Sequence, residues 1–161
     1  MNTSTQIAKH LRDVFFGGNW TTVNLKDTLA DVSWEQATTQ VYSFNTIATL
    51  AYHMTYYVTA VLEVLKGASL DASDKLSFAH PPITSQENWI QTQDKMWNEA
   101  EQFAALIEQF PEDKLFTDFT DSKYGNYYRN FNGIIEHSYY HLGQIVLIKK
   151  IIAAQANPVI V

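Results

Sequence analysis

The sequence contains no cysteine among its 161 residues. Disulfides, iron–sulfur clusters, thiolate zinc sites and a cysteine nucleophile are therefore excluded. The metalloprotease pattern HExxH is absent as well, because Ser138 rather than glutamate follows His137. No Glu-x-x-His occurs anywhere in the chain, which argues against a ferritin-like dinuclear carboxylate site.

Basic residues and long apolar runs are also scarce. The chain has 11 Lys plus Arg against 17 Asp plus Glu, a net charge of −6. This balance argues against a nucleic-acid partner, because phosphate binding needs a basic face. No apolar run approaches the roughly 20 residues that cross a bilayer, and the N-terminus lacks the pattern of a signal peptide. We therefore expect a cytoplasmic protein with no membrane partner.

Aromatic and apolar residues, in contrast, are abundant. Hydrophobic residues make up 46% of the chain, with 9 Tyr, 9 Phe and 4 Trp, which is typical of a globular protein with a substantial core. The length suits one domain, and we expect residues 1–161 to form it. The aromatic excess leaves apolar surface for an interface, and we expect a homodimer.

Apolar residues recur at helical spacing in several long segments, and no strand-like pattern competes with them. We expect helices over residues 3–16, 46–66 and 127–154, and another that begins after a capping box of Thr84 and Glu87. Ser33 and Gln36 form a second capping box, and residues 71–82 form a linker. The predicted fold is all-α, an antiparallel four-helix bundle.

Two histidines, His137 and His141, lie one turn apart on the last predicted helix. Their rings are about 6 Å apart along the helix axis, a separation that one metal ion can bridge. His53, on another predicted helix, is a candidate third ligand. Three neutral imidazoles leave a coordination position open, as expected of a metal that does chemistry. Spacing alone also allows histidines that bind no metal.

Three further residues are candidates for the surroundings of this site. Gln144 follows His141 by one turn and could position a substrate or a water, although an ordinary hydrogen bond between helices is an equal alternative. Tyr56 and Tyr57 follow His53 by three and four residues and could line a pocket, but aromatic residues at helical spacing are more often part of a core. The sequence identifies no general base.

The string His137-Ser-Tyr-Tyr-His141-Leu-Gly-Gln144 resembles the HxxxHxGQ motif in the last helix of the DinB-like family, whose members are four-helix metalloenzymes related to YfiT. The segment Asn45-Thr-Ile-Ala-Thr-Leu-Ala-Tyr-His53 is similar to the family's second helix, and the resemblance covers essentially the whole chain. It implies a DinB/YfiT-like bundle that holds a divalent metal ion, zinc or nickel, through His53, His137 and His141.

The resemblance also implies an activity. Characterised relatives include thiol transferases that use bacillithiol or mycothiol, a thiol-dependent maleylpyruvate isomerase, and proteins assigned as metal-dependent hydrolases. We expect a metal-dependent transferase or hydrolase acting on a small molecule, with any low-molecular-weight thiol supplied as a cosubstrate because the chain has no cysteine. The alternative is a metal-binding bundle without turnover, acting as a binding or stress-related interaction protein.

Overall fold

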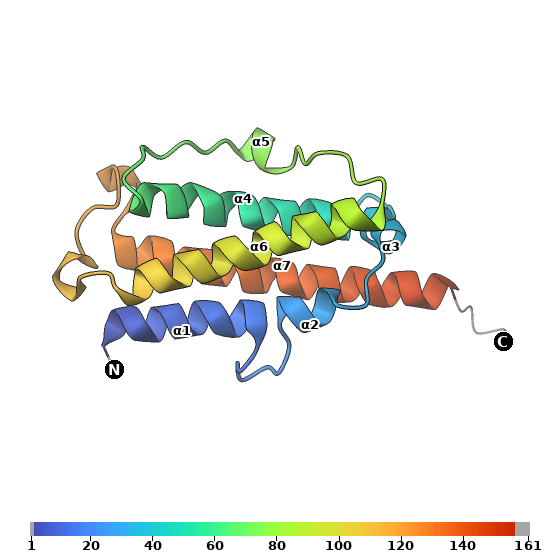
Figure 1. The fold of residues 1–161 in the computed structure, drawn as a ribbon, viewed down its shortest axis with the longest axis horizontal. Helices are drawn as coiled ribbons and strands as arrows, with labels where there is room; N and C mark the ends of the chain where they lie inside the picture. Colours follow the sequence, from blue (N-terminus) through green and yellow to red (C-terminus); the bar gives the residue numbers. More distant parts are fainter. Residues whose placement is uncertain (1, 157–161) are drawn as a thin grey trace.

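The computed structural model describes residues 2–156, and within that range the chain is helical with no strand. Four long helices lie side by side along the molecule: α1 (Thr3–Phe16), α4 (Ile47–Leu65), α6 (Gln86–Glu108) and α7 (Tyr127–Ala156) (Figure 1). The prediction of an all-α protein is confirmed. None of the helices in residues 2–156 combines the length and the apolar character needed to cross a bilayer.

The long helices do not all alternate in direction. α1 packs on α6 and α4 packs on α7 in antiparallel fashion, but α4 and α6, which also pack together, run in the same direction (Figure 1). Residues 66–85, which we call the crossover segment, lead the chain back along the full length of α4 before α6 begins. The purely antiparallel arrangement predicted from the sequence is therefore wrong for this pair.

Short helices fill the connections. α2 (Leu25–Leu29) and α3 (Trp34–Thr38) precede α4, and the 3₁₀ turns η1 (Glu112–Lys114) and η2 (Ser122–Tyr124) precede α7. The crossover segment, predicted as a linker, contains the four-residue helix α5 (Asp74–Ser77).

The helix caps show which local signals predict structure correctly. The capping box of Ser33 and Gln36 is present at the start of α3. The one predicted at Thr84 is wrong, because Ser85 caps α6 by accepting a hydrogen bond of 3.2 Å from the backbone N–H of Asn88. Ser85 supplies the required hydroxyl one residue later, and the Thr84 hydroxyl bonds to the Asn88 side chain instead.

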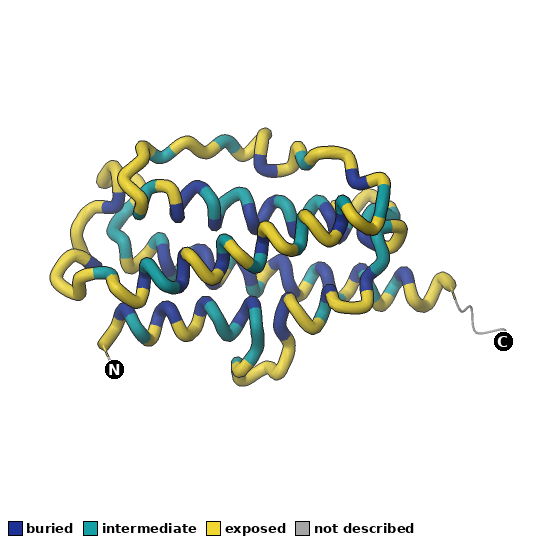
Figure 2. The backbone as a smooth tube through the Cα atoms, in the orientation of Figure 1, coloured by how far each residue is buried: buried dark blue, intermediate teal, exposed yellow. Residues whose placement is uncertain are grey.

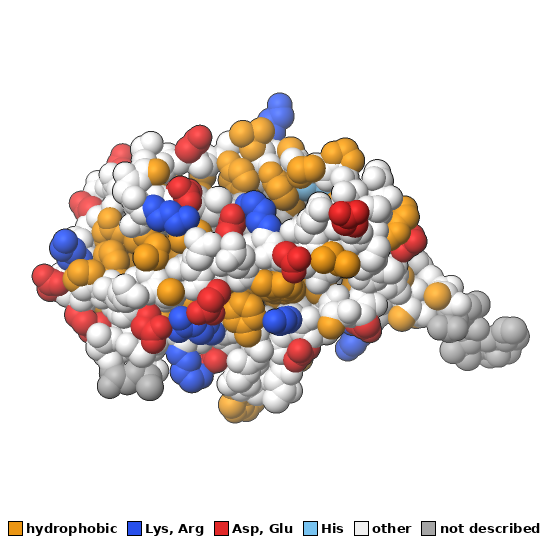
Figure 3. Space-filling view, viewed as in Figure 1, with side chains coloured by type: hydrophobic (Ala, Val, Ile, Leu, Met, Phe, Trp, Pro, Cys, Tyr) orange, Lys and Arg blue, Asp and Glu red, His pale blue; other side chains and the backbone are white. Residues whose placement is uncertain are grey.

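Buried residues recur along each of the four long helices, whereas the crossover segment is mostly exposed (Figure 2). Trp89, Phe15, Phe103 and Phe131 are the largest fully buried side chains. The Trp89 indole N–H is satisfied by the Val32 carbonyl at 2.8 Å, which ties α6 to the segment before α3. On the face shown in Figure 3, acidic and basic side chains are interspersed, and hydrophobic side chains gather over the crossover segment.

Candidate metal centre

The three histidines predicted to bind a metal meet between α4 and α7. His53 lies in the second turn of α4, which begins after Thr46, where the threonine side chain caps the helix. His137 and His141 lie one turn apart on α7, which packs directly on α4. One ligand nitrogen from each ring lies within 4.8 Å of the others, so the group could hold a metal ion.

The Nε2 atoms of these rings converge. His137 Nε2 lies 3.0 Å from His53 Nε2 and 2.9 Å from His141 Nε2. Around one tetrahedral ion with bonds near 2.05 Å, ligand nitrogens are roughly 3.3 Å apart. The rings would therefore need to separate by only a few tenths of an ångström to hold an ion.

Hydrogen bonds to the outer nitrogens fix the orientation of two of the rings. Ser77 Oγ donates its own proton to the Asp74 carbonyl at 2.6 Å, so it must accept from His53 Nδ1, which lies 2.8 Å away. Gln144 Oε1 accepts from His141 Nδ1 at 2.6 Å. A neutral imidazole carries one proton, so the Nε2 atoms of His53 and His141 each present a lone pair to His137.

The three histidines cannot satisfy the hydrogen-bonding capacity of all three Nε2 atoms among themselves. A single N–H on His137 Nε2 lies between two lone pairs and can serve only one of them well. A cation at the centre would be stabilised by lone pairs from all three rings at once. The hydrogen bonds that His53 and His141 donate to Ser77 and Gln144 are of the kind that orients metal-binding histidines in known sites.

Burial keeps the rings neutral, as metal ligation requires. Burial, followed by repulsion from His141 and His53, lowers the pKa of His137 to about 4. Burial is also the main cause of the lowered pKa values of His53 and His141. The His53 and His141 side chains are almost completely enclosed, at 4% and 6% exposed, whereas His137 is partly exposed. All three are therefore unprotonated near neutral pH.

The crossover segment covers the centre. Phe78 stacks on His53 with ring centroids 4.0 Å apart. Tyr57 packs edge-on against His53 and His137, and its hydroxyl donates to Asp74 at 3.2 Å. Burial raises the pKa of Tyr57, so its hydroxyl keeps its proton. Sequence reasoning missed Ser77 and Phe78, because they lie in a predicted linker and reach His53 only through tertiary folding.

Of the other candidate residues, some contact the histidine cluster and some do not. Gln144 is in direct contact with His141, and Tyr57 packs on the centre. Tyr56 lines a different cavity, on a neighbouring face of α4, and its ring packs edge-on against Tyr57 with centroids 5.6 Å apart. His80 lies 3.2 Å from the Thr49 hydroxyl, and His10 on α1 packs near Tyr139, so neither belongs to the cluster.

A cavity of about 350 Å³ lies beside Gln144, between α7 and the loop before α4. It is lined by Phe44, Asn45, Leu50 and Ile148 as well as Gln144. Since Gln144 Oε1 is occupied by His141, the side-chain NH₂ group is the part of this residue available to a molecule in the cavity. Gln144 thus connects the cluster to a space of small-molecule size.

Comparison with known proteins gives no matching family model, no matching curated protein and no matching solved structure. The function of the centre must therefore be argued from its own chemistry.

Proposed function

We propose that the protein is a divalent-metal-dependent enzyme of the DinB-like type, with His53, His137 and His141 as the metal ligands. The observation that carries the proposal is the convergence of three Nε2 atoms, two of them held with their lone pairs inward by Ser77 and Gln144. The resemblance of residues 45–53 and 137–144 to DinB-like motifs supports the same assignment and favours zinc or nickel.

A divalent ion held by three neutral imidazoles keeps its full charge and lowers the pKa of a bound water, or stabilises a bound thiolate. The side chains around it have separate roles. Ser77 and Gln144 orient His53 and His141, and Phe78 and Tyr57 exclude water from one side. The Gln144 NH₂ group donates to a substrate in the adjacent cavity.

The reaction class that best fits is transfer of a small thiol to an electrophile, or hydrolysis of a small ester or amide. A cavity of about 350 Å³ is at the small end of ligand pockets, which favours a small substrate. A thiol would have to come from a cosubstrate, because the chain has no cysteine.

The alternative is a metal-binding bundle without turnover. The burial of His53 and His141, at 4% and 6% exposed, favours it, since a catalytic ion needs an open approach. His137 is the most accessible of the three histidines. A catalytic ion would have to be reached by substrate from the His137 side, whereas an ion in a non-catalytic bundle needs no such approach.

Metal analysis and an activity screen test the proposal. Purified protein should carry about one divalent ion per chain, and turnover with thiol and electrophile pairs, or with activated esters and amides, should stop on chelation. His53→Ala should lose both metal and turnover and keep its helical circular dichroism, because the core does not depend on the ion. His10→Ala, an exposed histidine outside the cluster, is the matched control.

Two results would count against the proposal in different ways. Full metal occupancy in His53→Ala would remove the assigned site. Stoichiometric metal without turnover in a broad screen would favour the non-catalytic alternative.

A further inference from the structure

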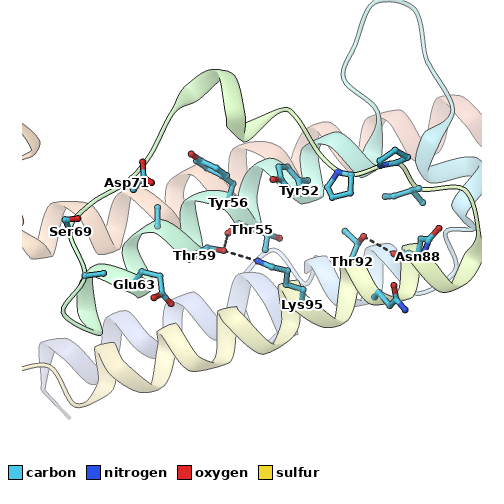
Figure 4. A pocket seen from close by; sticks show the side chains of 16 residues that line it. Tyr52, Thr55, Tyr56, Thr59, Glu63, Ser69, Asp71, Asn88, Thr92 and Lys95 are labelled. Atoms are coloured by element: carbon cyan, nitrogen blue, oxygen red, sulfur yellow. Dashed lines mark hydrogen bonds between the residues drawn. The ribbon is translucent and has the colours of Figure 1, made fainter.

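A second, larger cavity of about 830 Å³ lies between α4, α6 and the crossover segment (Figure 4). Its volume is within the range of sites that enclose small organic ligands. One face of α4 forms a wall, with residues at helical spacing: Tyr52, Thr55, Tyr56, Thr59, Ala60 and Glu63. None of the three cluster histidines lines the cavity, and the face of α4 that does lies next to the one that presents His53 to α7.

The floor of the cavity is polar but electrically compensated. Lys95 Nζ donates to Glu99 Oε1 at 2.7 Å, and Thr59 on α4 donates to the other oxygen of the same carboxylate. The ammonium charge of Lys95 is therefore matched by a carboxylate at hydrogen-bond distance. The floor consequently attracts no anion strongly, and its threonine hydroxyls, which donate their protons within the protein, can accept hydrogen bonds from a ligand.

One end of the cavity is acidic. Figure 4 shows Glu63, Ser69 and Asp71 grouped at this end, away from Asn88 and Thr92. Glu63 is paired with Lys66 at 2.9 Å. Asp71 has no ion pair or hydrogen bond within residues 2–156. Its uncompensated carboxylate gives this end a negative potential, which favours a cation and disfavours an anion.

The walls beside the acidic end are aromatic and apolar. The rings of Tyr52 and Tyr56 lie 6.4 Å apart and are tilted by 42° to each other. Pro81, Pro82 and Ile83 of the crossover segment also line the cavity. Such surfaces pack well against a ring, and tyrosine faces attract a positive charge.

We propose that this cavity binds small amphipathic amines. The ring of the ligand packs among Tyr52, Tyr56 and the two prolines, and its ammonium group lies toward Asp71 and Glu63. The inference does not depend on the metal-dependent activity, because none of His53, His137 and His141 lines the cavity.

A series of probes with one ring and different end groups tests the charge preference. Calorimetric titration of the full, metal-loaded chain with 2-phenylethylamine, 2-phenylethanol and phenylacetate at neutral pH gives three affinities. The amine should bind saturably with one site per chain, about threefold to fivefold tighter than the alcohol, and the carboxylate should bind most weakly. Equal affinities, tighter binding of phenylacetate, or no saturable binding of the amine would overturn the proposal.

Variants locate the site. Asp71→Asn should lower the affinity for the amine to that of the alcohol, whereas Asp113→Asn, an exposed aspartate outside the cavity, should leave it unchanged. Thr92→Trp should fill the cavity and abolish binding of both probes. Circular dichroism shows whether Thr92→Trp folds. If it does not fold, the amine affinity of Asp71→Asn is the measurement that tests the location of the site. Amine affinity that survives Asp71→Asn unchanged would place the amine elsewhere, and metal occupancy is expected to stay constant in all of these variants.

Discussion

Two faces of α4 carry different kinds of side chains, a histidine cluster on one and the wall of a cavity on the other. On the side facing α7, three imidazoles converge, and a separation of their nitrogens by a few tenths of an ångström would let them hold a single ion. On the side facing α6, threonine and tyrosine side chains line a cavity of about 830 Å³. The crossover segment covers both. A buried cluster of three histidines would select a metal ion by bond geometry. A large cavity with one charged end would select an organic ligand by shape and charge.

The largest expected effect concerns the metal side. His137→Ala should weaken zinc binding by more than about 100-fold, because it removes a ligand rather than an outer partner. Competition with a chromogenic chelator measures the affinity. The same variant should bind 2-phenylethylamine as the parent does. Loss of amine binding in His137→Ala would show that the two sides are one site.

Removal of an outer hydrogen bond should have a smaller effect. Ser77→Ala leaves the Nδ1–H of His53 without its acceptor and should lower zinc affinity by about 10- to 100-fold. Ser73→Ala, on the same segment, is the control, because the Ser73 side chain makes no capping hydrogen bond to α5. Identical affinities in the two variants would show that Ser77 does not orient His53.

The buried histidines should make the metal-free protein sensitive to acid. The pKa of His137 is about 4 in the folded protein and near 6.5 when exposed, so the unfolded state takes up a proton first as the pH falls. The free energy of unfolding should therefore be unaffected above about pH 6.5 and decrease between pH 6.5 and 4, by on the order of 2 kcal/mol for this residue. Urea unfolding at several pH values, with chelator present, measures it.

Replacement of His137 by asparagine provides the control for this pH effect. An asparagine side chain does not titrate, so the decrease in stability below pH 6.5 should be smaller in His137→Asn than in the parent. An identical pH dependence in the two proteins would assign the effect to other groups.

The smallest effect is expected on the cavity side of α4. Tyr56→Phe removes the hydroxyl that accepts the Ser73 backbone N–H at 2.8 Å, and should lower the free energy of unfolding by about 1 kcal/mol. Tyr52→Phe, which alters the same cavity, should leave stability nearly unchanged. Zinc affinity should change less than about twofold in both. A large loss of zinc binding in Tyr56→Phe would show that the metal centre depends on this contact.

The sequence predicted the histidine cluster better than its surroundings. His137 and His141 are linked by helical spacing, which is a local property, and His53 lies on a strongly periodic helix. Gln144 is also one helical turn from its partner His141. The proximity of these residues could therefore be anticipated from local pattern and resemblance.

Ser77 and Phe78 could not be predicted in this way. α5 has only four residues, too few for a periodic signal, and its contacts with His53 depend on where the crossover segment settles. The parallel direction of α4 and α6 likewise follows from the path of residues 66–85 rather than from either helix. The large cavity also depends on this path, because it is lined by the crossover segment together with α4 and α6. The sequence pattern of one helix therefore could not predict it.

The crossover segment contacts both sides of α4 within a few residues, since the Ser73 backbone donates to Tyr56 and the Ser77 hydroxyl accepts from His53. A change in the position of the crossover segment would therefore affect the affinity for the metal ion and the affinity for the amine. Thermodynamic reciprocity then requires that whatever factor an amine imposes on metal affinity, the metal imposes on amine affinity. Titration of the metal in the presence of the amine, and of the amine in the presence of the metal, gives the coupling free energy between the two binding events. Its sign shows whether both ligands favour the same position of the crossover segment.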